Sequence, residues 1–82
     1  MYQTTSLRIY VIFMMNLRKL VGNNIRKKRK EHGWSQEKLA GKARLTSDYV
    51  GSLERGQVNV SLDSLERISK CLEIPINELF VK

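Results

Sequence analysis

Residues 35–56 decide the fold and read SQEKLAGKARLTSDYVGSLERG. Two hydroxyl residues in this segment, Ser35 and Thr46, each follow an apolar residue and precede another at the fourth position of a possible helix. The hydroxyl can accept a hydrogen bond from a free backbone N–H, and the apolar pair can pack as a hydrophobic staple. The segment therefore predicts a helix over 36–43, a three-residue connection and a second helix over 47–55.

The side chains of these two predicted helices allow them to cross closely and share a core. Ala40 and Ala43 are small where the helices must meet, and Leu45, Val50 and Leu53 supply apolar contacts. A helix of eight residues, a connection of three and a second short helix have the dimensions of a helix-turn-helix.

The chain on either side predicts further helical segments. Apolar spacing predicts a helix over 17–32, ended by Gly33, and Ser61 begins another over 62–72. Pro75 fits the first position of a last helical turn. The inner face of the fourth helix is expected to consist of Leu62, Leu65, Ile68 and Leu72. The predicted fold class is all-α, with five helical segments in one domain over residues 17–82.

Residues 1–16 form a separate apolar extension. The apolar run Ile9–Met15 is too short to span a bilayer and lacks the flanks of a signal peptide, so we expect a cytoplasmic protein without membrane insertion. Its β-favouring residues predict a short strand that could pair with its copy in a second chain. Alternatively, translation begins at Met14 or Met15, and the preceding residues are not normally made.

Charge points to a polyanionic partner. The net charge is +7, and the chain up to Arg44 contains eleven basic residues but only two acidic ones. This balance suits nucleic acid or an anionic membrane, and charge alone does not choose between them. Cys71 and His32 are each the only residue of their type, and His32 is expected to be solvated at a helix end. No nucleophile–base pair, metal cluster or phosphate loop is visible, so neither an enzyme nor a metal or other cofactor is expected.

Two charges occupy positions where the helical pattern calls for apolar groups. Arg29 is four residues after Ile25, and Glu54 is four after Val50. An unpaired buried charge is very costly, so the two are predicted to meet as a hydrogen-bonded ion pair. The alternative is that both lie at the edge of the apolar stripe and reach water.

The combined motifs resemble the Cro/C1-type helix-turn-helix proteins, the XRE family of bacterial and phage regulators. The matching motifs are Arg29, Gly33–Gln36, Leu39–Ala40, Tyr49–Val50, Leu53–Gly56, Ser61–Leu62, Leu65 and Ile68. The resemblance runs from about Asn24 to Phe80. The ending Glu73–Phe80 is most similar to small single-domain repressors, including the controller proteins of restriction–modification systems, although some antitoxins share the pattern.

This resemblance implies a lambda-repressor-like five-helix domain that binds double-stranded DNA as a homodimer, with its third helix in the major groove. Ser47, Asp48 and Ser52 would face the bases. Arg55 and Asn59 would hold phosphates. The full set of residues placed at DNA is Gln36, Arg44, Thr46, Ser47, Asp48, Tyr49, Ser52, Arg55, Gln57 and Asn59. Arg29 and Glu54 match a structural ion pair of the family.

Two departures from the family pattern affect the expected site. Arg44 stands where relatives usually carry glycine, so a left-handed backbone there would cost about 1 kcal/mol. The third helix is poor in Arg, Asn and Gln, the best readers of bases, so specificity would depend more on Gln57, Asn59 and DNA shape.

The leading functional hypothesis is a homodimeric transcriptional regulator, repressor or activator, on a palindromic operator. It would be controlled by its own concentration and not by a small-molecule effector. The dimer interface is predicted at Leu72, Ile76, Leu79 and Phe80. An alternative is an antitoxin that binds DNA and a toxin, and a third is a membrane-associated basic peptide that uses Ile9–Met15.

Overall fold

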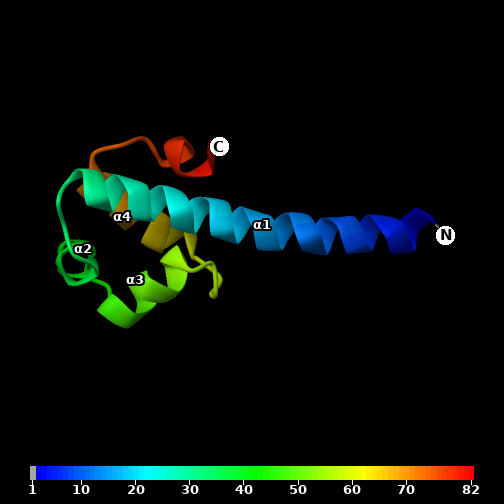
Figure 1. Cartoon of the computed structure of the whole chain (residues 1–82), viewed down its shortest axis with the longest axis horizontal. Helices are drawn as coiled ribbons and strands as arrows, with labels where there is room; N and C mark the ends of the chain where they lie inside the picture. Colours follow the sequence, from blue (N-terminus) through cyan, green and yellow to red (C-terminus); the bar gives the residue numbers. More distant parts are fainter. Residues whose placement is uncertain (1) are drawn as a thin grey trace.

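The computed structural model describes the backbone of residues 2–82 and the side chains of residues 16–82. Its elements are α1 (Tyr2–Glu31), α2 (Gln36–Ala43), α3 (Ser47–Glu54), α4 (Leu62–Leu72) and the 3-10 helix η1 (Ile76–Phe80). The C-terminal half of the long α1 lies at the centre, with α2 and α3 on one side of it and η1 on the other, and the N-terminal half extends beyond the other elements (Figure 1). The protein is therefore all-helical over the described backbone, and its fifth helical segment is a 3-10 turn.

The three predicted helix starts are confirmed by their caps. The side-chain oxygens of Ser35, Thr46 and Ser61 accept hydrogen bonds at 3.0, 3.1 and 3.0 Å from the backbone N–H three residues further on. Each cap satisfies one of the four N–H groups that a helix start leaves without a partner. Local chemistry thus sets the bounds of α2 and α4 as predicted, and α3 ends one residue earlier than expected, at Glu54.

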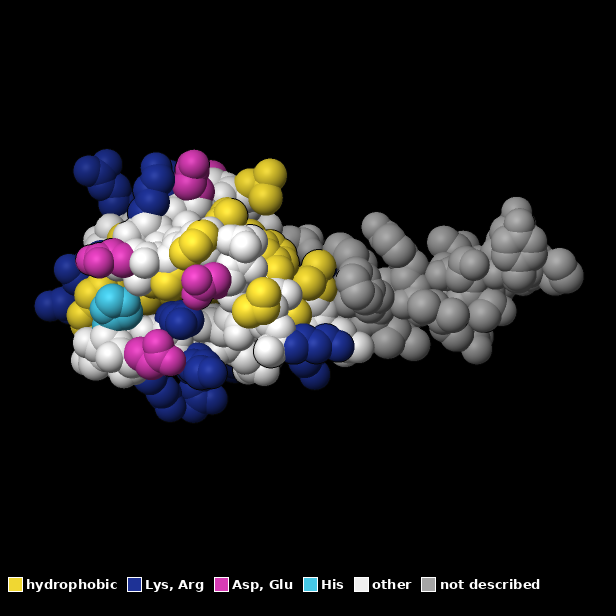
Figure 2. Space-filling view, turned by 90° about the horizontal axis from the view of Figure 1, so that it is seen from above, with side chains coloured by type: hydrophobic (Ala, Val, Ile, Leu, Met, Phe, Trp, Pro, Cys, Tyr) yellow, Lys and Arg dark blue, Asp and Glu magenta, His cyan; other side chains and the backbone are white. Residues whose placement is uncertain are grey.

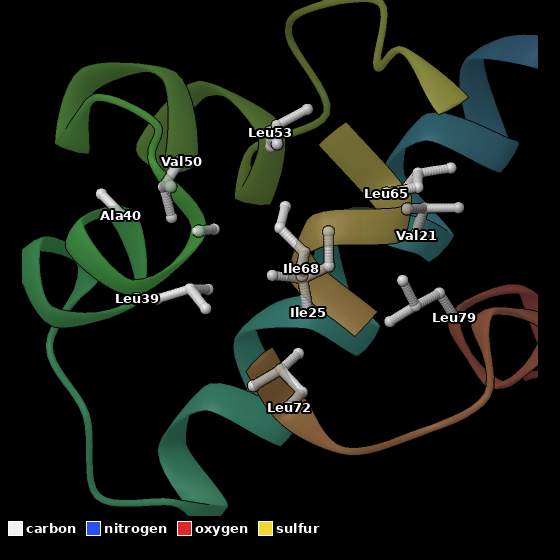
Figure 3. Packing of buried hydrophobic residues seen from close by; sticks show 11 residues of the cluster. Val21, Ile25, Leu39, Ala40, Val50, Leu53, Leu65, Ile68, Leu72 and Leu79 are labelled. Carbon is white, nitrogen blue, oxygen red and sulfur yellow. The ribbon is translucent and has the colours of Figure 1, made fainter. Parts of the chain in front are cut away.

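The core collects side chains from all five elements. Ile25 of α1 and Ile68 of α4 lie together, with Leu39 of α2 and Leu79 of η1 reaching them from two sides (Figure 3). These four residues are fully buried. Burying an aliphatic side chain stabilises a fold by about 1.5–3 kcal/mol, so this small cluster holds the helices in one arrangement.

A glycine allows α1 to pack directly on the end of α3. A Cβ added at Gly22 would overlap the backbone oxygens of Leu53 and Glu54, the latter at 2.8 Å. Neither atom belongs to a flexible side chain, so α1 and α3 would have to separate. Gly22 therefore fixes how close α3 lies to α1.

The strand predicted at Ile9–Met15 is wrong, because α1 includes these residues and begins at Tyr2, not at residue 17. A lone strand would leave its backbone groups without partners, whereas a helix satisfies them within the segment. β-Propensity is a weaker constraint than this requirement. The side chains of this run, on which the strand pairing and the membrane hypothesis depend, lie outside those that the structure describes.

Leu62 also departs from its predicted place on the inner face of α4, since it is 78% exposed. It is the first residue of α4, and this first turn extends past the edge of the core, which α4 enters at Leu65. Among the described residues, no helix is long and apolar enough to cross a membrane.

We expect Gly22→Ala to lower the free energy of unfolding by about 1–3 kcal/mol, the usual range for overpacking, although alanine favours helices. Urea titration followed by circular dichroism measures this change. Gly41→Ala is the matched control, because a Cβ there meets nothing within 4 Å and should stabilise α2 by about 0.5–1 kcal/mol. Equal gains in both variants would contradict the close packing of α1 on α3.

Candidate nucleic-acid interface

Helix α3 has one buried side and one side turned to solvent. Val50, Leu53 and Glu54 are buried, whereas Asp48 is exposed and Ser52 is half-buried. In Figure 1, α3 lies at the edge of the molecule, on the side of α1 away from η1. A short helix with these features can present polar side chains outward while its inner side anchors it.

The anchor is a buried ion pair between α1 and the last residue of α3. Arg29 Nε and Nη2 donate to the two carboxylate oxygens of Glu54 at 2.7 and 2.9 Å, and Arg29 Nη1 donates to the backbone oxygen of Trp34 at 2.8 Å. The two residues are only 7% and 6% exposed. The structure thus brings together the two charges that the sequence predicted to meet, in a bidentate geometry that satisfies both.

The same contact keeps the arginine charged. The hydrogen bond to the Glu54 carboxylate raises the pKa of Arg29, and the attraction of the carboxylate adds to this rise, while burial opposes it. A raised pKa means that the stabilisation is complete below the ordinary pKa of arginine and is lost only as the pH rises above it. Arg29 therefore stays charged at neutral and acidic pH.

Gln36, predicted to contact DNA, extends this network from the start of α2. Its Nε2 donates to Glu54 Oε1 at 3.0 Å. Its Oε1 lies beside Gly51 of α3, 3.4 Å from the position of an added Cβ. The amide therefore ties the start of α2 to α3.

The segment after α3 holds Arg55 in a defined position. Arg55 Nε donates to Gln57 Oε1 at 2.9 Å, and Nη2 donates to Ser52 Oγ at 3.4 Å. Gly51 leaves room for the guanidinium, since a Cβ there would lie 3.2 Å from Arg55 Nη1. Three residues predicted at DNA thus form one cluster. Asn59, by contrast, lines a hollow beside Leu17 of α1.

The connection between α2 and α3 contains Arg44, at which the family pattern suggests a left-handed backbone. Arg44 has φ 59° and ψ 44°, and its backbone oxygen accepts from Arg67 Nη1 of α4 at 3.3 Å. Arg67 also pairs with Asp63 at 2.8 Å. Arg44 and Thr46 are exposed, and Ser47 and Tyr49 are half-buried. An L-residue in this conformation lowers the stability of the fold by about 1–2 kcal/mol, and contacts elsewhere in the structure offset this loss.

Half of the predicted dimer interface is unavailable in this fold. Leu72 and Leu79 are 1% and 0% exposed, because the small core uses both, whereas Ile76 and Phe80 are more than one third exposed. Leu62 and Val81 are exposed as well. Figure 2 shows hydrophobic side chains open to solvent on the face that carries α1 and the C-terminal end.

Two polar residues make contacts that the sequence does not predict. Asn24 Nδ2 donates to the backbone oxygens of Leu79 and Val81 at 2.9 and 2.7 Å and so fastens the C-terminal segment to α1. His32 Nε2 donates to the Leu72 oxygen at 3.0 Å, and its ring stacks on Trp34 at 4.4 Å between centroids. The hydrogen bonds have no signal in sequence spacing, because the accepting backbone oxygens lie far along the chain.

Comparison with known proteins agrees with this geometry. The family model HTH_3, described as Helix-turn-helix, matches residues 25–79. The chain belongs to the XRE-type helix-turn-helix family. The resemblance inferred from the motifs is therefore confirmed.

Relatives of this XRE-type protein include restriction–modification control proteins and transcriptional regulators. Control protein C.BamHI of Bacillus amyloliquefaciens is 43% identical over 65 residues, covering 78% of this chain and 80% of that protein. The HTH-type transcriptional regulator SinR of Bacillus subtilis is 38% identical over 61 residues, covering 73% of this chain and 55% of SinR. The crystal structure of the restriction–modification controller protein C.AhdI from Aeromonas hydrophila gives a TM-score of 0.75 at 41% identity, covering 77% and 96% of the two chains.

We expect Arg29→Met and Glu54→Leu each to lower the free energy of unfolding by about 3–5 kcal/mol, because each leaves a buried charge without its partner. The double variant should lose much less free energy of unfolding than the two single variants lose together. Urea titrations of the three variants measure the coupling. Additive losses would rule out the pairing as a source of stability.

Proposed function

We propose that this protein is a sequence-specific transcriptional regulator that binds double-stranded DNA as a homodimer on a palindromic operator. The observation that carries the proposal is the polar outer face of α3, a helix whose end is held by the buried Arg29–Glu54 pair. Its XRE-type relatives are transcriptional regulators and control proteins, which supports the same role here.

In this proposal α3 enters the major groove, where each base pair presents a distinct set of donors and acceptors. Asp48 accepts from cytosine N4, while the hydroxyls of Ser47 and Ser52 discriminate poorly. Base contacts alone then supply limited specificity. DNA shape between the two half-sites supplies the remainder, because deforming a duplex costs an energy that depends on its sequence.

Phosphate contacts position the helix on the duplex. Arg55 is already held by Gln57 and Ser52, so it binds a phosphate without first losing much side-chain freedom. Arg44 and Thr46 are exposed at the connection before α3 and face the backbone of the same groove. Contacts of this kind fix register and orientation but carry no sequence information.

The second copy docks on the exposed apolar surface formed by Leu62, Ile76, Phe80 and Val81. An apolar hollow between α1, the start of α4 and Phe80 adjoins this surface and gives a partner side chain a place to insert. Two-fold symmetry then places the half-sites about one helical turn, or a multiple of it, apart.

We expect selection from random duplex DNA to return a motif with two related half-sites. Asp48→Asn should change the preferred base at one position in each half-site, with about 5- to 150-fold loss on the original base. Glu66→Gln on α4 removes the same charge from an exposed position away from α3 and should leave the motif unchanged. A motif unaffected by Asp48→Asn would remove α3 as the reader.

We expect Phe80→Glu and Leu62→Glu to convert a dimer to a folded monomer, because a carboxylate cannot be buried in an apolar interface without a partner. Sedimentation or light scattering at several concentrations measures the shift. Asn23→Glu, exposed on the opposite flank of α1, is the control and should remain dimeric. A wild-type monomer that binds a co-encoded protein through this surface would instead support the antitoxin alternative.

A further inference from the structure

Helix α1 has two flanks with different neighbours. On one flank, Lys28 Nζ approaches Glu78 of η1 at 3.8 Å. On the other, Gly22 packs on the end of α3, and Lys19 lies against Gly56, where a Cβ would be 3.1 Å from Lys19 Cα. The second flank is therefore next to the segment that follows the recognition helix.

A row of exposed polar residues follows this second flank. Lys19, Asn23, Arg26 and Lys30 are spaced by four, three and four residues, which places them on one side of a helix, and all four are exposed. We call these four residues the basic stripe.

The basic stripe lacks the opposite charges that usually accompany a solvated surface. The only acidic residue of α1 is Glu31, which pairs with Lys28 on the other flank. Within residues 16–82, none of the three cations of the stripe has a carboxylate within salt-bridge distance. Like charges four residues apart, such as Arg26 and Lys30, destabilise a helix. Binding a polyanion would relieve this repulsion.

The stripe also has the right location and length to follow a duplex. Lys19 lies beside Gly56, and Arg55 directly precedes that glycine. The eleven-residue step from Lys19 to Lys30 covers about 16 Å at 1.5 Å per residue. One DNA strand carries a phosphate about every 3.4 Å along the helix axis, so this length matches a few consecutive phosphates.

We propose that the basic stripe binds the phosphate backbone of the duplex that flanks the half-site read by α3. The inference rests on the proposed function, since it takes α3 as the reader of the bases. The stripe adds affinity that is independent of sequence, and it extends the protected DNA beyond the base pairs that determine specificity.

The test measures dissociation constants by fluorescence anisotropy from 50 to 300 mM salt. The probes are the selected operator with ten-base-pair flanks and the same operator trimmed to the motif. The stripe variant is Lys19→Gln with Arg26→Gln, which keeps the aliphatic stem that covers Gly56. The control is Lys28→Gln with Lys70→Gln, which removes equal charge from the other flank of α1 and from α4.

On the flanked operator, the stripe variant should lose about 1–2 units of the slope of log K against log salt, with about 10- to 100-fold weaker binding at 0.1 M salt. The control variant should keep the wild-type slope and the wild-type affinity at 0.1 M salt. On the trimmed operator, the stripe variant and wild type should bind alike. The charge-retaining exchange Lys19→Arg with Arg26→Lys should restore the slope, which a purely structural role would not predict.

Equal slopes for the stripe variant and the control would overturn the inference and leave the proposed function intact. The same holds if wild type binds the trimmed and flanked operators equally well. A wild-type protein that selects no sequence from random DNA would instead contradict the proposed function itself. The two failures are therefore distinguishable.

Discussion

The arrangement of this domain depends on one buried polar contact. Arg29 reaches Glu54 through two hydrogen bonds, the Trp34 oxygen accepts a third, and Gln36 donates to the same carboxylate. The contact thereby joins α1, the start of α2 and the end of α3. Buried charges of this kind tolerate little displacement, because any loss of geometry exposes the full cost of desolvation. The angle at which α3 is presented is thus set by electrostatics as well as by apolar packing.

A steric constraint complements the ion pair. Gly22 lets the backbones of α1 and α3 approach, and Gly56 does the same for Lys19 one turn earlier along α1. Because α1 also contacts η1 on its other flank, it lies between the proposed DNA surface and the proposed dimer surface. In the proposed homodimer, a rigid helix in this position would couple the separation of the two copies of α3 to the way in which the partners dock.

Local signals predicted most of the fold. The hydroxyl caps at Ser35, Thr46 and Ser61 determine helix starts through atoms within three residues, so the sequence alone contains the necessary information. The apolar run at residues 9–15 has the propensity of a strand, but propensity does not show whether a pairing partner exists. Its helical state follows from continuity with the helix that comes after it.

The site was less predictable than the fold, because its details depend on distant partners. Leu72 and Leu79 were expected at the dimer surface, since a sequence shows that a residue is apolar but not how much volume the core must fill. Gln36 stays a predicted contact to a phosphate or base edge, and only the structure shows that its Nε2 donates to Glu54. The intramolecular role of Gln57 and the steric role of Gly22 likewise depend on neighbours that spacing does not reveal.

Two helices in this protein end on a non-glycine residue in the left-handed conformation, Arg44 after α2 and Glu73 after α4. Natural domains are rarely at their stability optimum. Strained positions such as these two lower the free energy of unfolding below what the same fold could reach. Glu73 is exposed in the connection between α4 and η1. At Arg44 the same strain accompanies a cation in the turn before α3, which the proposed function places at a phosphate. On that proposal, a glycine at this position would strengthen the fold and weaken DNA binding.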